Sequence, residues 1–157
     1  MASDIHVTAA SVIERDGRFL LVEEHADGRV VLNQPAGHLD PGESLPEAAS
    51  RETLEETGYT FVPSHLVGVY HWQIESGTTY VRFTFGGEAT APTGPVQLDH
   101  GIVAVHWLTR PQMLAREHEL RSPIVLRCVD DYLAGKRYSL DLVRYLPLER
   151  VARRATP

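Results

Sequence analysis

The sequence predicts one α+β domain, spanning residues 1–157, in which a few helices pack on a mixed β-sheet. A chain of 157 residues fits one domain and can bury a core without disulfides or a structural metal. Hydrophobic residues make up 43% of the chain and charged residues 23%, which are ordinary values for a globular protein. Strand-like runs outnumber helix-like segments and do not alternate strictly with them, which favours a mixed sheet covered by helices.

The first third of the chain reads as three strands. Apolar and β-branched residues dominate 5–14, 18–24 and 30–35. Asp16-Gly17 and Asp27-Gly28 separate these runs, and Asp-Gly pairs are typical of tight turns between paired strands. The segment therefore predicts consecutive antiparallel strands.

The clearest helix signal covers residues 44–57, after a loop rich in glycine and proline at 37–42. Ser44 is a favourable N-cap, and Glu47 follows three residues later to complete a capping box. Gly58 supplies a left-handed C-cap. Both ends of this helix are thus specified locally.

The remaining chain predicts further strands and two helices. A helix begins at Thr109-Pro111, and a longer one is capped by Ser122-Pro123 and ends near Gly135. The expected strands are 61–74 and 79–85, which flank a Ser76-Gly77 turn, and 102–108, which follows a loop at 91–99.

Several broad functional classes are disfavoured by composition. Cys128 is the single cysteine, and no apolar run reaches the length of a signal peptide or a membrane span, so we expect a cytoplasmic protein with no membrane partner. The basic residues from Lys136 onward are expected to form a solvated end and not a nucleic-acid arm. The chain itself leaves open whether the protein is a monomer or a homodimer.

Most of the net charge of −6 lies within residues 40–58. The acidic residues there are Asp40, Glu43, Glu47, Glu52, Glu55 and Glu56, against Arg51 as the one base. At about 100° per residue, Glu52, Glu55 and Glu56 fall within an arc of roughly 100° of the helix, where like charges repel. A solvated acidic face is one explanation, and a divalent cation bound by oxygen ligands is the other. Leu54 is expected to point away from this face, toward the core.

The segment 37–59 resembles the Nudix box. That signature is Gly, five residues, Glu, seven residues, Arg-Glu, an aliphatic residue, any residue, Glu-Glu, any residue, Gly and an aliphatic residue. Every charged and glycine position matches, at Gly37, Glu43, Arg51, Glu52, Glu55, Glu56 and Gly58. Thr53 and Tyr59 replace the two aliphatic residues, which changes packing and leaves the chemistry intact.

The resemblance implies the Nudix α/β/α sandwich, with a mixed sheet between helices, and a magnesium-dependent hydrolase of diphosphate linkages. Segments similar to the NudJ phosphatase branch of the family occur in order, at 6–8, 22–24, 33–39, 82–85, 120–123 and 135–138. That branch implies action on nucleoside tri- and diphosphates and on the pyrimidine diphosphate precursor of thiamine. The alternatives are a Nudix pyrophosphatase for ADP-sugars or dinucleoside polyphosphates, and a non-catalytic Nudix-fold binding module. Such modules typically lose box carboxylates, whereas this box keeps all of them.

The same resemblance implies roles for the box residues. The metal ligands, for magnesium with manganese as the alternative, would be Glu52, Glu55, Glu56 and the Gly37 carbonyl. Arg51 would orient Glu52 through a charge-assisted hydrogen bond, and Glu43 would support the ligands from outside. Arg51, Glu52 and Glu56 form the expected catalytic set. The general base is open between Glu52, Glu88 and Asp99.

Four residues outside the metal set are candidates for substrate binding: Asn33, His38, Trp72 and Arg82. His38 could touch a phosphate or be an ordinary loop histidine. Trp72 and Phe85 could stack on a base, although core packing is the commoner role of such rings. Arg82 could bind substrate or form a surface ion pair. Alternation along the strand puts Arg82 and Phe85 on opposite faces, and we expect Arg82 to face the site and Phe85 the core.

Overall fold

The computed structural model describes residues 4–147 as two four-stranded sheets with helices on both sides. The elements in chain order are β1 Ile5–Val12, β2 Glu14–Arg15, β3 Arg18–Ala26, β4 Arg29–Asn33, β5 Ala36–His38, α1 Leu45–Thr57, β6 Thr60–Gln73, β7 Thr79–Thr90, β8 Ile102–Thr109, α2 Arg110–Ala115, a 3₁₀ turn Glu117–Glu119, α3 Ile124–Leu133 and a second 3₁₀ turn Leu140–Leu142.

The first sheet is mixed and has the strand order β5-β1-β7-β6. β1 and β7 are parallel, and the pairs β1–β5 and β6–β7 are antiparallel. The second sheet is antiparallel: β3 pairs with β2 and β4 along one edge and with β8 along the other. The strands expected from the sequence are present, but they divide between two sheets.

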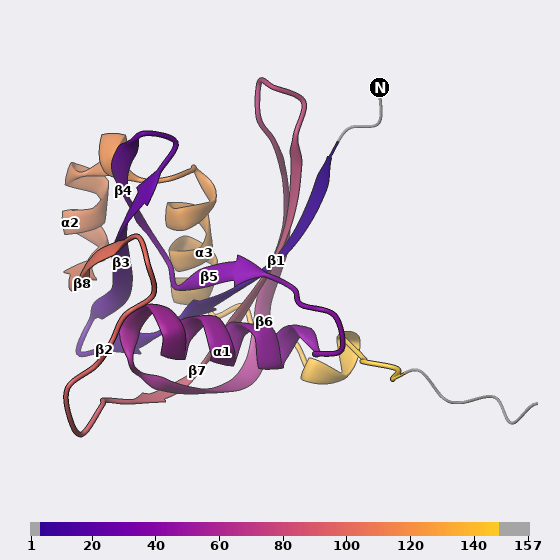
Figure 1. The fold of residues 1–157 in the computed structure, drawn as a ribbon. Helices are drawn as coiled ribbons and strands as arrows, with labels where there is room; N and C mark the ends of the chain where they lie inside the picture. The colour runs from indigo at the N-terminus through magenta and orange to yellow at the C-terminus, as the bar shows by residue number, and fades with distance from the viewer. Residues whose placement is uncertain (1–3, 148–157) are drawn as a thin grey trace, which may run out of the picture.

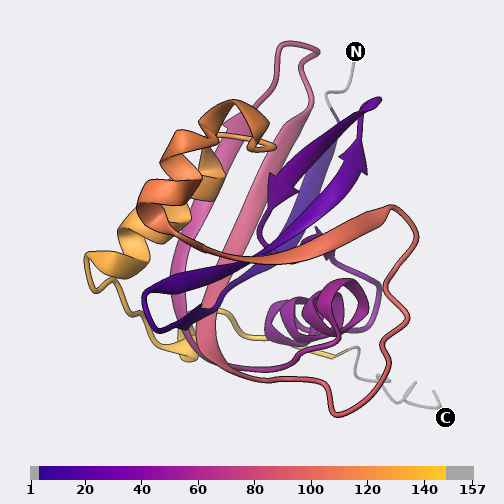
Figure 2. The ribbon, with the colours of Figure 1, turned by 90° about the vertical axis from the view of Figure 1, so that its left-hand side faces the viewer.

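The layers match the expected α/β/α sandwich (Figures 1 and 2). Figure 2 shows α2 and α3 on one side of the sheets and α1 on the other. One hydrophobic cluster, which includes Ala48 and Phe85, lies between α1 and the sheets. A second cluster, which includes Leu21 and Val125, lies beneath α2 and α3.

Helix α1 begins and ends where the sequence predicts. The Ser44 side chain accepts from the backbone N–H of Glu47, the Glu47 side chain completes the capping box, and Gly58 adopts a left-handed φ of 75°. The expectation for Leu54 is wrong, because its side chain is 50% exposed. Its neighbour Thr53 is fully buried instead: its hydroxyl donates to the Ala49 carbonyl and receives a hydrogen bond of 2.8 Å from Ser11 of β1.

Three other details differ from the sequence-based expectations. The loop around Gly37 contains the short strand β5, because its backbone pairs with β1. Strand β7 continues to Thr90, beyond the expected residue 85, because it stays paired with β6 as far as Thr60. The last helix has Pro123 as its N-cap and no side-chain cap, so the Ser122 hydroxyl does not cap it. Arg150, Arg153 and Arg154 of the basic end lie outside the described residues.

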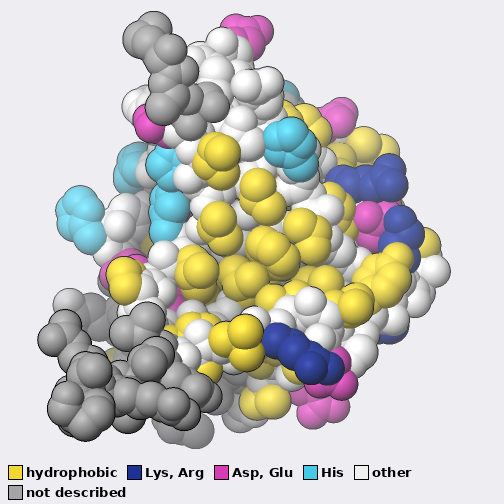
Figure 3. Space-filling view, turned by 90° about the vertical axis from the view of Figure 1, so that its right-hand side faces the viewer, with side chains coloured by type: hydrophobic (Ala, Val, Ile, Leu, Met, Phe, Trp, Pro, Cys, Tyr) yellow, Lys and Arg dark blue, Asp and Glu magenta, His cyan; other side chains and the backbone are white. Residues whose placement is uncertain are grey.

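Part of the first sheet extends past α1 and carries exposed apolar side chains. Ile5 of β1 is 65% exposed and Val69 of β6 is 50% exposed. Figure 3 shows hydrophobic side chains gathered over this side of the molecule. Among the described residues, no helix combines the length and the apolar character that a membrane crossing requires.

Phe85→Ala should lower the free energy of unfolding by about 3–5 kcal/mol, because Phe85 is fully buried between α1 and the first sheet. Leu54→Ala, on the exposed side of α1, should cost less than about 1 kcal/mol. Urea denaturation of both variants checks this difference, and equal losses would contradict the assigned orientation of α1.

Candidate active site

Arg51 of α1 is the centre of an ion-pair network that holds the box together. Its Nε and Nη2 donate to the two carboxylate oxygens of Glu43 at 3.0 and 2.7 Å. Its Nη1 donates to Glu52 at 2.7 Å and to Glu55 at 3.1 Å. Nη2 also donates to the His38 carbonyl at 3.0 Å, so Arg51 links α1 to β5 and to the loop between them. The bond to Glu52 is the one that the Nudix resemblance implies for Arg51.

Hydrogen bonding to these carboxylates holds the pKa of Arg51 well above its ordinary value. The same contacts hold the pKa of Glu43 below its usual range, because the guanidinium stabilises the ionised carboxylate. Glu43 is therefore ionised and serves as the outer partner of Arg51.

Glu52 and Glu56 are buried carboxylates, 9% and 7% exposed. Burial raises the pKa of Glu52 in spite of its bond to Arg51. For Glu56, burial raises the pKa to about 8, although the Ala36 backbone N–H donates to its carboxylate at 2.9 Å. Glu24, Glu52 and Asp99 add further negative charge near Glu56. Arg121 pairs with Glu24 and Arg51 with Glu52, whereas Glu56 itself has no ion-pair partner among the described residues.

Gly37 of β5 lies directly against Glu52. A Cβ at position 37 would overlap the Glu52 carboxyl group, so any larger residue here would displace that carboxyl group. This approach brings the backbone of β5 next to the carboxylates of the helix.

The donor set at this site suits a hard divalent cation. The carboxylates of Glu52, Glu55 and Glu56 and the nearby backbone of Gly37 supply only oxygen, which is typical of magnesium or manganese sites. Within residues 4–147, no three such side chains already converge at metal-binding distances. Arg51 holds Glu52 and Glu55, and Glu56 is turned to the Ala36 N–H, so binding an ion requires these side chains to reorient.

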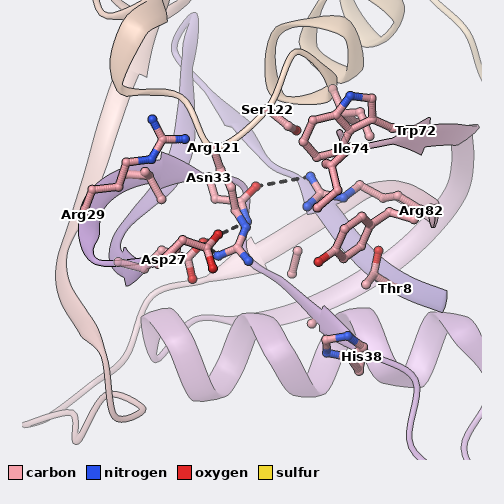
Figure 4. A pocket seen from close by; sticks show the side chains of 17 residues that line it. Thr8, Asp27, Arg29, Asn33, His38, Trp72, Ile74, Arg82, Arg121 and Ser122 are labelled. Carbon is pink, nitrogen blue, oxygen red and sulfur yellow. Dashed lines mark hydrogen bonds and ion pairs between the residues drawn. The ribbon is translucent and has the colours of Figure 1, made fainter. Parts of the chain in front are cut away.

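A cavity of about 240 Å³ opens beside the box (Figure 4). It extends from Gly37 and His38 on β5 to Trp72 and Ile74 near the tip of the β6–β7 hairpin. All four substrate-binding candidates from the sequence, Asn33, His38, Trp72 and Arg82, line it. The structure therefore brings these residues together next to the carboxylates.

Arg82 is buried in this cavity and forms no ion pair with any residue of 4–147. Its Nη1 donates to Asn33 Oδ1 at 3.2 Å and to Gln34 Oε1 at 3.3 Å. Phe85 lies on the other face of β7, fully buried in the core, as alternation predicts. Asn33 in turn donates to Glu24, which also pairs with Arg121 at 3.1 Å.

The candidate Trp72 belongs to a row of rings across the first sheet. Trp72, Tyr80 and His6 occupy paired positions on β6, β7 and β1. The Trp72 and Tyr80 rings stack at 6.0 Å, and Tyr80 stacks on His6 at 5.1 Å. His38 is exposed and makes a hydrogen bond of 2.9 Å with His6. Trp72 is partly buried, so one wall of the cavity is aromatic.

Sequence reasoning did not assign a role to Glu24, Gln34, Tyr80 or Thr8, all of which contact or line the site. Their only sequence signal was their place in or near segments similar to the NudJ branch. Of the base candidates outside the helix, Asp99 is tied to the box by a backbone hydrogen bond of 2.9 Å to Glu55. Glu88 lies on an exposed stretch of β7 opposite Val62, and no hydrogen bond or ion pair among the described residues joins it to the box.

The fold and this site define a hydrolase that acts on phosphoanhydrides. Residues 4–128 match the NUDIX domain family, and the chain belongs to that family. The phosphatase NudJ of Escherichia coli strain K12 is 39% identical over 140 residues, which cover 88% of this chain and 90% of that protein. The phosphatase NudJ of Shigella boydii serotype 4 (strain Sb227) is similar to the same extent.

Solved structures agree with this assignment. A NUDIX hydrolase from Nitrosomonas europaea has a TM-score of 0.88 and 50% sequence identity, covering 91% of this chain and 98% of its own. The MutT protein from Methanosarcina mazei Go1 has a TM-score of 0.69 and 23% identity, covering 87% of this chain and 99% of its own. The second similarity supports the fold alone.

The raised pKa of Glu56 predicts how the stability of the metal-free protein depends on pH. The folded pKa of about 8 exceeds the ordinary value of 4.5, so folding binds a proton between these two values. In chelator, the free energy of unfolding should fall as pH rises from about 4.5 to 8, by about 1–3 kcal/mol. Glu56→Gln should remove most of this slope, and Glu55→Gln, at an exposed position of the same helix, should retain it. Denaturant titrations at several pH values measure the slope, and parallel slopes for all three proteins would refute the assignment.

Proposed function

We propose that this protein is a magnesium-dependent hydrolase of diphosphate linkages that works in the cytoplasm on small substrates of the NudJ type. These are nucleoside tri- and diphosphates and hydroxymethylpyrimidine diphosphate, the pyrimidine precursor of thiamine. One observation supports the proposal above all. The face of α1 that carries the clustered carboxylates lies next to a cavity that contains a buried cation, Arg82. The 39% identity to phosphatase NudJ supports the substrate class. The presence of a single, buried thiol at Cys128 supports a reducing compartment.

Glu52, Glu55 and Glu56, with the Gly37 carbonyl, would hold the divalent cation. When bound, the ion neutralises phosphate charge, polarises a phosphoryl oxygen and lowers the pKa of water. The chain's own residues prepare this site. Arg51 fixes the Glu52 carboxylate through its 2.7 Å bond, and Glu43 fixes Arg51 from the opposite side.

Glu52 and Asp99 are the carboxylates we assign as candidates to take the proton from the attacking water. Glu52 is buried beside Gly37, and burial raises its pKa toward the range in which a carboxylate can accept a proton effectively. Asp99 lies at the same end of the box as Glu55. Glu88 has no comparable position, and we do not assign it a role.

The size of the cavity favours the smaller substrates. Pockets for drug-sized ligands typically enclose roughly 300–1,000 Å³, whereas this cavity encloses about 240 Å³. A single heteroaromatic ring fits such a space better than the second sugar of an ADP-sugar or the second nucleoside of a dinucleoside polyphosphate. Trp72 and Ile74 supply apolar surface for a ring.

A substrate panel tests the proposal directly. Nucleoside tri- and diphosphates, hydroxymethylpyrimidine diphosphate, an ADP-sugar and a dinucleoside tetraphosphate should be compared with magnesium present. Orthophosphate and pyrophosphate should be assayed separately, because this identifies the phosphorus that is attacked. Higher kcat/KM for the ADP-sugar or the dinucleoside tetraphosphate than for the small substrates would contradict the proposed class.

Removal of metal should abolish turnover and leave the fold intact. Chelation should reduce activity to background, and magnesium should restore it, whereas calcium should support it poorly because the larger ion accepts a looser geometry. Circular dichroism should show an unchanged fold in chelator, since the two hydrophobic clusters do not depend on the ion. Full activity in excess chelator would refute metal dependence.

Glu56→Gln should lower kcat at least a hundredfold, which corresponds to about 2.7 kcal/mol of transition-state stabilisation. The substitution preserves shape and removes a charge needed to bind the ion. Glu75→Gln, at an exposed position in the β6–β7 hairpin, is the matched control and should retain wild-type kinetics. A Glu56→Gln enzyme with more than about a tenth of wild-type kcat and unchanged magnesium affinity would show that Glu56 is not part of the site.

A further inference from the structure

Arg82 is a buried cation, 8% exposed, with hydrogen-bond donors still free. Its Nη1 donates to the amide oxygens of Asn33 and Gln34, and it forms no ion pair with another residue of 4–147. Glu24 and Glu56 act on its charge without contacting it. Nε and Nη2 have no hydrogen-bond partner among the same residues. A buried guanidinium held in this way suits an acceptor from outside the chain.

Thr8 of β1 is a second buried donor beside Arg82. In the sheet it is paired with Arg82 of β7 on one side and with His38 of β5 on the other. It lines the same cavity and is 6% exposed (Figure 4). Its Oγ1 is buried and has no hydrogen-bond partner within the described part of the chain. A buried hydroxyl without a partner is destabilising, so its presence at a cavity wall indicates a ligand atom that satisfies it.

The charges that line the cavity favour an anion at these two donors. Three arginines face two acids there: Arg29, Arg82 and Arg121 against Glu24 and Asp27. Arg121 and Glu24 pair with each other, so this pair leaves the balance positive. Guanidinium groups bind phosphate oxygens through charge-assisted hydrogen bonds, which are stronger than bonds to a neutral acceptor. A phosphate oxygen therefore fits Thr8 and Arg82 better than a neutral carbonyl does.

The two donors also lie close to the carboxylates of α1. The strand order β5-β1-β7-β6 puts Thr8 on the strand next to β5, and β5 borders the carboxylates. Gln34, which accepts from Arg82, stands two residues before Ala36, whose backbone N–H donates to Glu56. The two phosphates of a diphosphate share one bridging oxygen. With one phosphate at the carboxylates, the other is therefore within reach of Thr8 and Arg82.

The organic part of the substrate is expected at the opposite end of the cavity. Trp72 of β6 and Ile74, just beyond that strand, supply apolar surface there (Figure 4). β6 is the strand farthest from β5 in this sheet. Thr8 and Arg82 lie on the strands between, so the phosphate that reaches them is the one that carries the organic group.

We propose that Thr8 and Arg82 bind the phosphate that carries the organic group, by donating hydrogen bonds to one of its non-bridging oxygens. This inference rests on the proposed function, since it concerns the same site. The carboxylates of α1 and their cation then hold the neighbouring phosphate. Both side chains act on every substrate of the proposed class, because each of these substrates contains such a phosphate.

Inorganic phosphate in excess chelator tests this site without metal and without turnover. By isothermal titration calorimetry, the wild-type protein should bind phosphate, and Thr8→Val should bind it about tenfold more weakly, the effect of one hydrogen bond to a charged group. Thr8→Ser keeps the hydroxyl and should stay near the wild-type affinity. Arg82→Gln should bind at least tenfold more weakly. If Arg82→Gln does not fold, the two Thr8 variants decide the result.

Sulfur substitution tests which phosphate is bound. ADP should be compared with the two diastereomers of ADPαS, in which sulfur, a poorer hydrogen-bond acceptor, replaces one non-bridging oxygen or the other. With wild-type enzyme and magnesium, one diastereomer should show kcat/KM about tenfold below ADP, mainly through KM. Manganese should not restore it, because the replaced oxygen lies on Thr8 and Arg82 and not on the cation. Thr8→Val should lower kcat/KM for ADP about tenfold and should abolish the difference between ADP and that diastereomer.

Thr84→Val is the matched control. Thr84 is a fully buried threonine on the same strand face as Arg82; its hydroxyl bonds Cys128, and it lies outside the residues that line the cavity. This variant should keep the wild-type phosphate affinity and the wild-type difference between ADP and its analogue. Thr8→Val should keep or raise the melting temperature, because it removes an unsatisfied hydroxyl.

The possible results separate this inference from the proposed function. Equal phosphate affinities of the wild-type protein and Thr8→Val would overturn the inference. So would additive losses from Thr8→Val and the α-sulfur, or a coupling of Thr8→Val to ADPβS in place of ADPαS, which would put the terminal phosphate at this site. If phosphate binding depends on Thr8 but the wild-type protein cleaves no phosphoanhydride, the proposed function fails and the phosphate site stands.

Discussion

The site depends on the guanidinium of Arg51. Three carboxylates of the box accept hydrogen bonds from it, and the backbone carbonyl of His38 accepts another. Without this cation, the carboxylates on α1 would repel one another, and the loop between β5 and α1 would lose its main attachment to the helix. Because Gly37 permits β5 to approach, the same side chain fixes the carboxylates and the strand next to them. The guanidinium of Arg51 thus offsets the repulsion between the crowded carboxylates of the box.

Arg51 does not compensate every buried ionisable group near the cavity. Glu56 is buried and near the negative charges of Glu24 and Asp99, which keeps its pKa high. Across β5 and β1, Arg82 is a buried cation held by neutral amides. Glu24 and Glu56 act on Arg82 electrostatically, but among residues 4–147 neither of them forms an ion pair with it. A cation beside Glu56 and an acceptor oxygen beside Arg82 would stabilise the charged forms of both groups.

The sequence predicted those features that local interactions determine. The ends of α1 follow from Ser44, Glu47 and Gly58, whose capping hydrogen bonds all lie within the first and last turns of the helix. The turns at Asp16-Gly17 and Asp27-Gly28 follow from the left-handed conformations that these residues adopt. Leu54 was misplaced because the helix pattern alone did not show that Thr53 would bond Ser11, which is 42 residues away.

The cavity could not be predicted in the same way, because it is made by strand register. The choice between Arg82 and Phe85 for the site face depends on how β7 aligns with β1, and a slip of one residue would exchange the two faces. In the observed register, Phe85 packs in the core beneath α1, and this burial favours the alignment strongly. The same alignment pairs Arg82 with Thr8 and places both beside Asn33. Apolar burial on one face of β7 therefore determines which polar side chains line the cavity on the other face.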